Sequence, residues 1–220
     1  TGDIRTLLDY SNYKNVNTSQ ACFANLFYHC WVLTSAPDLP ATELAFNCYN
    51  GMFYWCPYLQ NAPELPATKL NTQCYQNMFW GCTRLTKAPK LPATKLAFAC
   101  YNGMFEYCYW LQEAPELPAT TLAEQCYMDM FAYCYLTKAP KLPATELKPR
   151  CYTTMFSNCE KLKEVPELPA TKLAEFCYTS MFAGCTALTK APKLAPAETV
   201  AKNCYRLMFD GCKELTDGPE

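Results

Sequence analysis

The sequence of 220 residues is poor in histidine and glycine, and it has no long run of one charge or of apolar residues. Its only histidine is His29 and its seven glycines form no phosphate-binding loop, so we expect no active site, metal site or cofactor. A net charge of -1 without a run of five like charges argues against nucleic-acid or membrane binding. The N-terminus carries Asp3, Arg5 and Asp9 in place of a signal-peptide apolar region, so the chain is expected to be soluble as given.

Cysteine and proline, in contrast, are abundant and recur at fixed spacing. The string C-Y-x-x-M-F-x-x-C begins at Cys48, Cys74, Cys100, Cys126, Cys151, Cys177 and Cys204, and a looser copy begins at Cys22. The starts from Cys48 to Cys204 are 25 to 27 residues apart, and the eight copies contain all 16 cysteines. A single period of this length predicts a solenoid, because one unit alone cannot bury its apolar side.

Each unit predicts a short strand, a turn and a helix. In the unit that begins at Leu59, the strand is Leu59 to Ala62, and Pro63 must end it because proline has no N–H for a ladder. Thr68 is the expected N-cap of a helix that ends near residue 80, with apolar residues four apart from Leu70 to Cys82. Since strands stack more closely than helices, such units predict a curved solenoid with the strands inside.

The phrases A-P-E-L-P-A-T-x-L, C-Y-x-x-M-F and M-F-x-G-C-T-x-L-T resemble the BspA-type leucine-rich repeats of bacterial surface proteins. The resemblance covers Cys22 to about Thr216 and implies a secreted or surface-anchored binding protein, often an adhesin, without catalytic residues. The fold class that we predict is an α/β solenoid, a right-handed leucine-rich-repeat horseshoe of eight units with short parallel strands on its concave face. Residues 1–20 are the expected N-terminal cap, 21–203 the repeats and 204–220 a C-terminal cap unit.

Charges beside the A-P dipeptide alternate in sign from one unit to the next. They read Lys87/Lys90, Glu113/Glu116, Lys138/Lys141, Glu164/Glu167 and Lys190/Lys193. Opposite charges on adjacent strands add about 0.2–1 kcal/mol each, and the alternation disfavours a slipped register. Its strictness favours an engineered, consensus-based variant over a natural protein, in which case the chain is a recombinant soluble protein instead of an extracellular or cell-surface one.

The cysteines are expected to be buried free thiols. On a helix, partners eight residues apart lie about 12 Å apart, which exceeds the limit for a disulfide. Equivalent cysteines of neighbouring units would be separated by about one helix diameter, which is also too far. We therefore interpret them as small apolar core residues, with disulfides as the alternative.

Aromatic residues flank the second cysteine in the first five units, whereas small or polar residues occupy these positions in the last three. Identical units cannot bury Trp where their neighbours hold Gly or Lys, so we expect these side chains to be exposed along the concave rim. Polar residues of the adjacent strands extend this surface. The predicted target-binding residues are Tyr28, His29, Trp31, Val32, Tyr54, Trp55, Tyr58, Gln60, Asn61, Trp80, Arg84, Glu106, Tyr107, Tyr109, Trp110, Gln112, Tyr133 and Tyr135.

The sequence therefore predicts a non-catalytic binding protein, an engineered or selected scaffold that recognises a protein or peptide. Tyr and Trp dominate binding hot spots, and a patch of this size calls for a partner or for self-association. A natural adhesin for a host matrix protein or a glycan is the alternative, and a purely structural spacer without a partner is a third reading.

Overall fold

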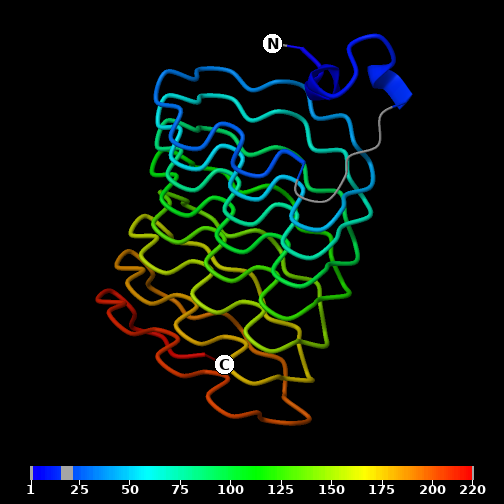
Figure 1. The fold of residues 1–220 in the computed structure, drawn as a ribbon. Coiled ribbons are helices and arrows are strands. Elements are labelled where there is room, and N and C mark those ends of the chain that lie inside the picture. Colours follow the sequence, from blue (N-terminus) through cyan, green and yellow to red (C-terminus); the bar gives the residue numbers. More distant parts are fainter. Residues whose placement is uncertain (1, 16–21, 220) are drawn as a thin grey trace.

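The computed structural model describes residues 2–15 and 22–219, and each copy of the repeat forms one coil of a stack (Figure 1). Backbone hydrogen bonds join residues that lie about one repeat apart in neighbouring coils. The Tyr49 N–H donates to the Cys74 carbonyl and the Phe131 N–H donates to the Met155 carbonyl, both at 2.9 Å. The chain is therefore a repeat solenoid, as its period predicts.

The motif that predicts a helix forms a row of tight turns instead. The helices of the described residues are two 3-10 helices near the N-terminus, η1 (Ile4–Leu7) and η2 (Tyr13–Asn15), and neither could span a bilayer. The predicted helix that begins at Thr68 is wrong, and so is the strand–turn–helix description of the unit. In each coil consecutive turns, here called the turn ribbon, cover residues 22–29, 46–55, 72–81, 98–107, 124–133, 149–158, 175–184 and 202–211.

Backbone hydrogen bonding in the turn ribbon alternates from one residue to the next. In residues 75–82, one set of N–H groups donates to carbonyls of the next coil at 2.8–3.0 Å, namely those of Tyr75, Asn77, Phe79 and Gly81. The intervening N–H groups donate to the carbonyl three residues back at 3.0–3.2 Å, namely those of Gln76, Met78, Trp80 and Cys82. Every N–H in this stretch therefore has a backbone partner, as a buried segment requires.

Left-handed residues set the four-residue period of the turn ribbon. In the coil of residues 72–81, the positive φ angles are 56° at Gln73, 53° at Asn77 and 69° at Gly81. The other turn ribbons repeat this spacing of four residues. Each left-handed residue reverses the chain between two turns, so the buried residues also recur every four positions. This period produced the helical pattern in the sequence.

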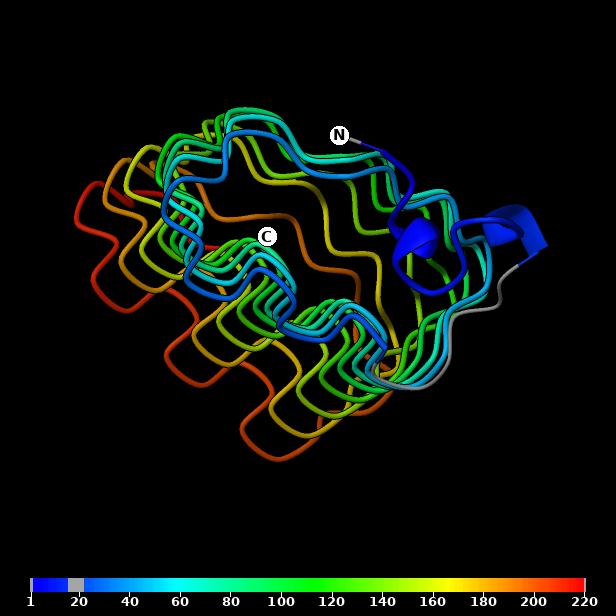
Figure 2. The same cartoon turned by 45° about the horizontal axis from the view of Figure 1, so that its top comes forward.

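The other side of each coil is an extended, proline-rich segment, which appears as the smoother side in Figure 2 opposite the scalloped turn ribbons. Pairing between coils is limited there to isolated parallel bridges, such as Asn61 with Lys87 and Lys87 with Glu113. The predicted four-residue strand is thus reduced to a bridge at its third residue, because the proline two positions later cannot donate a hydrogen bond.

The basis for a curved horseshoe is also missing. The prediction of a concave strand face depended on helices being thicker than strands. Here both sides of a coil are joined to the next coil through backbone pairing, the turn ribbon by hydrogen bonds and the proline side by bridges. The difference in thickness between a helix layer and a strand layer is therefore absent, and the curvature that depended on it loses its basis.

The core consists of columns of equivalent side chains from successive coils. Tyrosine rings stack from Tyr49 to Tyr205 with centroids 5.8–5.9 Å apart. Phenylalanine rings stack in a second column from Phe27 to Phe209, with centroids 5.5–5.9 Å apart. Buried cysteine, methionine and leucine columns fill the remaining space.

All 16 cysteines are free thiols, as predicted, and all are buried except the half-buried Cys22, Cys30 and Cys212. The geometric reason given above was wrong, because no helix separates them. The second cysteine of a coil donates its S–H to the phenylalanine carbonyl of the preceding coil. For Cys82 and Phe53 the distance is 3.2 Å, and the bond recurs from Cys56 to Cys212. A disulfide would remove this donor from a buried carbonyl.

The N-terminal segment packs on the first coil. The Ile4 N–H donates to the Asp38 carbonyl at 3.2 Å, and the Asp38 N–H donates to the Gly2 carbonyl at 2.9 Å. Ile4 is buried against the core, and Asp3 caps η1 by accepting from the Arg5 N–H. The stretch 16–20 of the predicted cap lies outside the described residues, and the domain boundaries stay a prediction.

Candidate binding surface

The predicted target-binding residues, apart from Gln60, Asn61 and Gln112, lie at the end of the turn ribbon and in the short segment that follows the second cysteine. None of them is buried. The most exposed of the large hydrophobic side chains among them are Val32 at 86%, Trp31 at 58%, Trp110 at 56% and Tyr28 at 51%. The alternative that these rings pack in the core is therefore excluded, while their role in binding stays a prediction.

Five rings form a continuous stack across five coils, here called the aromatic ridge: Tyr28, Tyr54, Trp80, Tyr107 and Tyr133. Tyr28 to Tyr54 and Tyr54 to Trp80 are parallel contacts with centroids 4.9 and 4.5 Å apart. Trp80 meets Tyr107 edge to face at 4.9 Å, and Tyr107 stacks on Tyr133 at 4.4 Å. Sequence spacing alone does not reveal that side chains from two different repeat positions make one ridge.

The ridge changes repeat position between Trp80 and Tyr107 for a steric reason. The first three rings come from the residue two before the second cysteine, whereas Tyr107 and Tyr133 come from the residue directly before it. In the fourth coil Glu106 replaces the ring at the first position, and in the third coil Gly81 leaves the second position without a side chain. The ring of Trp55 lies in the space above Gly81, where an added Cβ would come within 2.4 Å of its Cε3 atom.

Several of these rings are attached to left-handed backbone. The φ angles are 56° at His29, 54° at Trp55, 60° at Tyr107 and 61° at Tyr133. This region costs an L-residue about 1–2 kcal/mol, and bulky side chains rarely occupy it. Left-handed residues recur every four positions in all the turn ribbons, so this backbone belongs to the scaffold. What differs here is that large rings occupy positions where other coils carry Gly or Asn.

Beside the ridge lies an outer row of exposed side chains from the residue two after the second cysteine: Val32, Tyr58, Arg84 and Trp110. The guanidinium of Arg84 lies over the ring of Tyr58, 4.4 Å from its centroid. The backbone N–H of Trp110 donates to the Thr83 carbonyl at 3.3 Å, so the backbone at Trp110 in the next coil runs beside that of Thr83 and Arg84. Tyr109 and Tyr135 lie between this row and the ridge, with centroids 6.1 Å apart.

Glu106 is a half-buried carboxyl within the aromatic ridge. Burial raises its pKa to about 7, the charge of Asp129 acts in the same direction, and a hydrogen bond from the Trp80 side chain opposes them. Burial also raises the pKa of Asp129, which accepts a hydrogen bond from the Thr154 hydroxyl in the next coil. Asp129 was not among the predicted residues, because it lies outside the positions flanking the second cysteine, four residues before Tyr133.

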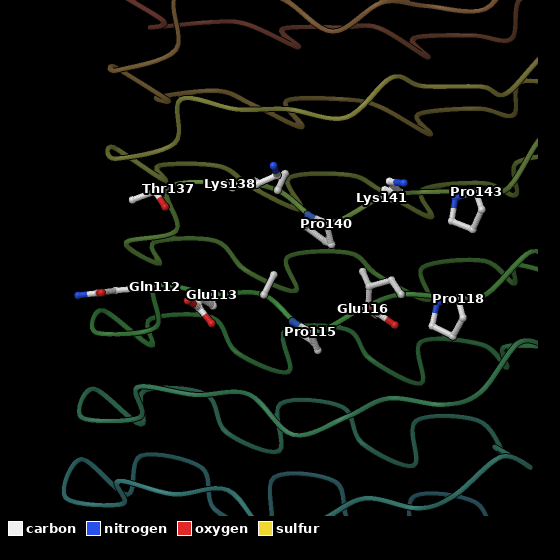
Figure 3. Close-up of a pocket in the computed structure, with 13 residues that line it drawn as sticks. Gln112, Glu113, Pro115, Glu116, Pro118, Thr137, Lys138, Pro140, Lys141 and Pro143 are labelled. Atoms are coloured by element: carbon white, nitrogen blue, oxygen red, sulfur yellow. The ribbon is translucent and has the colours of Figure 1, made fainter.

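The predicted polar residues Gln60, Asn61 and Gln112 are exposed, but they belong to the proline-rich side. Gln112 lies at one end of a groove of about 760 Å³, formed by residues 112–118 of one coil and 137–143 of the next (Figure 3). Pro115 and Pro140 contribute to this groove, and Glu and Lys line its two sides. The structure therefore divides the predicted site into an aromatic part and separate polar residues on the proline-rich side, of which Gln112 lines the groove.

The alternating charges of the proline-rich side lie next to each other in the stack. Bridges pair Lys87 with Glu113, Glu113 with Lys138, and Lys138 with Glu164. An ion pair joins Lys138 to Glu164 at 2.8 Å, with both side chains exposed. Like charges at these positions would face one another, so the alternation has a physical reason in the stack itself.

The described residues contain no group of three His, Cys, Asp or Glu side chains that could hold a metal ion. No family model matches the sequence, and no curated protein matches it either. Among solved structures, the chain is similar to a leucine-rich repeat protein from Bacteroides ovatus, with 19% identity and a TM-score of 0.41. The match covers 88% of this chain but only 39% of the Bacteroides protein, so the chain spans less than half of that protein's length.

A second similar structure is a leucine-rich cell surface protein from Faecalibacterium prausnitzii, with 18% identity, a TM-score of 0.31, and coverage of 98% of this chain and 81% of that one. Both are bacterial leucine-rich repeat proteins, the class that the repeat phrases of this chain resemble. At this level of similarity neither structure bears on what the chain binds, so the proposals below depend on its own residues.

Proposed function

We propose that the chain is a non-catalytic binding protein that recognises a protein or peptide through the aromatic ridge and the outer row. The observation that carries this proposal is the run of exposed and half-buried rings along five successive coils, where the equivalent positions of the last three coils are small or polar. Tyr, Trp and Arg are the residues enriched in binding hot spots. Four of these aromatic residues occupy left-handed backbone where the last three coils carry Asn or Gly, which fit that conformation better, so stability alone does not account for the choice of rings.

The orientation of the rings favours a protein or peptide over a glycan. A sugar ring stacks on the face of an aromatic ring, but in the ridge the faces of Tyr28, Tyr54 and Trp80 are turned toward one another. Tyr107 and Tyr133 cover each other in the same way. Edges and phenol hydroxyls remain for a partner, and these suit the carbonyls and apolar side chains of a polypeptide.

The origin of the chain is a separate matter from its binding. Strict charge alternation suggested a designed variant, but adjacent opposite charges are favourable in any such stack and therefore do not distinguish design from natural selection. A natural bacterial surface protein with the same ridge is the second candidate, supported by the BspA-like repeat phrases. The gene upstream and downstream of these residues would separate the two, since an export signal and an anchor belong only to the natural protein.

The test is selection of binders from a library of random 12-residue peptides, followed by affinity measurements on variants. Trp110→Ala should lower the affinity for the selected peptides about 30-fold, the equivalent of about 2 kcal/mol. The melting temperature of the protein should change little, because Trp110 is exposed. Phe98→Ala is the matched control, since Phe98 is also exposed (38%) but lies at the start of a turn ribbon, away from the second cysteine. Peptides whose affinity is insensitive to Trp110→Ala and Trp31→Ala would contradict the proposal.

A further inference from the structure

We infer that the target presents a carboxylate, from an Asp or Glu side chain, to the guanidinium of Arg84. Arg84 belongs to the outer row, and the aromatic ridge and the outer row together are called the aromatic site. The inference rests on the proposed function and names the chemistry that the partner must bring. The argument uses the charges of the surface, the surroundings of Arg84 and the cost of covering an unpaired cation.

Arg84 is the one permanent charge among the predicted binding residues that the structure describes. The other basic or acidic residues of that set are His29, whose ring packs on Tyr28 at 4.4 Å, and Glu106, which is half-buried in the ridge. No hydrogen bond or ion pair to the Arg84 guanidinium occurs within residues 2–15 and 22–219. Its donors are therefore left for solvent or for a partner.

The Arg84 guanidinium is restricted by a ring against one of its faces. Tyr58 stacks on the guanidinium at 4.4 Å, and the hydrogen bond from the Trp110 N–H to the Thr83 carbonyl places the backbone of Trp110 in the next coil beside that of Arg84. Stacking covers the face of a guanidinium and leaves its edge of N–H donors free. Because the side chain is already ordered, less conformational entropy is lost when those donors bind an acceptor.

Covering Arg84 without pairing it would oppose binding. A partner that buries Trp110 and Tyr58 must also remove water from the guanidinium between them. Leaving a charge desolvated and unpaired at an interface costs several kcal/mol, whereas a carboxylate meets the planar fork with two parallel hydrogen bonds. A partner that uses the aromatic rings therefore has to supply an anion at this point.

Two peptide libraries of 12 residues test the inference, one complete and one that lacks Asp and Glu. Peptides selected from the complete library should contain an acidic residue, and Arg84→Gln should lower their binding affinity about 10- to 100-fold. Arg84→Lys should lower the affinity about tenfold, because lysine keeps the positive charge but lacks the pair of parallel N–H donors of the guanidinium. Replacing the peptide's Asp or Glu by Asn or Gln should lower its affinity for the wild-type protein by the same factor as Arg84→Gln does. The same replacement should leave its affinity for the Arg84→Gln variant unchanged.

Arg150→Gln is the matched control, because the Arg150 guanidinium also lies over a ring, that of Phe176 at 5.0 Å, but far from the aromatic ridge in sequence. It should leave affinity unchanged. If acid-free peptides bind as tightly and still depend on Trp110, the inference is wrong and the proposed function stands. If no selected peptide depends on Trp110 or Trp31, the proposed function itself is wrong. A preference of more than tenfold for phosphoserine over Asp at the same peptide position would replace the carboxylate by a phosphate and overturn the assignment.

Discussion

Gly81→Ala tests the packing on which the aromatic surface depends. An alanine Cβ at this position would lie 2.4 Å from Cε3 and 3.0 Å from Cζ3 of the Trp55 ring, which is held by its contact with Trp80 at 5.2 Å. Moving a packed ring costs about 1–3 kcal/mol. The backbone adds about 1 kcal/mol, since φ at Gly81 is +69° and alanine is strained there. We expect a loss of about 2–4 kcal/mol in the free energy of unfolding.

Urea unfolding of four variants separates the two contributions. Gly211→Ala is the control, because Gly211 has a φ of +73° but its added Cβ would meet only the Gly184 backbone at 3.6 Å, so about 1 kcal/mol should be lost. Trp55→Ala measures the free energy of unfolding lost with the ring alone. The double variant with Gly81→Ala has no clash, so its loss should be about 1–3 kcal/mol smaller than the sum of the two single losses. If Gly81→Ala costs no more than Gly211→Ala, or if Trp55→Ala does not relieve it, the ring does not lie over Gly81 and the described surface is wrong.

Two further predictions concern titratable groups. Burial raises the pKa of Cys56 and Cys177 to about 11 and that of Cys74 to about 12, so at pH 8 only about a thousandth or less of each thiol is thiolate. In the folded protein, iodoacetamide should therefore label at most Cys22, Cys30 and Cys212, as read by mass spectrometry. Rapid labelling of further cysteines would contradict the buried thiol columns. Glu106 has a pKa of about 7 when folded and near 4.5 when unfolded, so the folded state holds a proton that the unfolded state releases, and stability should fall as pH rises from about 4.5 to 7. Glu106→Gln should reduce this fall in urea unfolding at pH 5 and pH 8, and an unchanged slope would show that Glu106 is not responsible.

The sequence predicts the repeat, the core columns and the exposed positions, because each follows from comparing equivalent residues. Every coil places Cys, Tyr, Met and Phe of the motif in the same environment, so their recurrence identifies the core without knowledge of the backbone. The same comparison identifies Trp31 and Trp110 as exposed, since other coils hold Glu or Lys at related positions. None of these inferences requires a helix or a strand.

The backbone could not be predicted from the spacing of apolar residues, because a four-residue turn imitates a helix. Apolar residues at Leu70, Cys74, Met78 and Cys82 are spaced by four without exception, whereas a true helix has 3.6 residues per turn and would drift to another face. Left-handed positions gave a second signal, because Asn77 and Gly81 follow Gln73 at the same spacing and are residues that tolerate positive φ. The strict period and these residues together indicate a turn ribbon.

The size of the aromatic site decides between a peptide segment and a broad protein face. Since both sides of the stack have the spacing of hydrogen-bonded chains, five coils place Tyr28 and Tyr133 about 20 Å apart. The site extends from the ridge to the outer row over roughly four residues, or about 13 Å. Its area of about 260 Å² is well below the roughly 800 Å² that each partner buries in a standard protein interface. An extended segment of about six residues spans 20 Å, so a peptide or a protruding loop fits the site along its length, with one acidic residue near its middle facing Arg84.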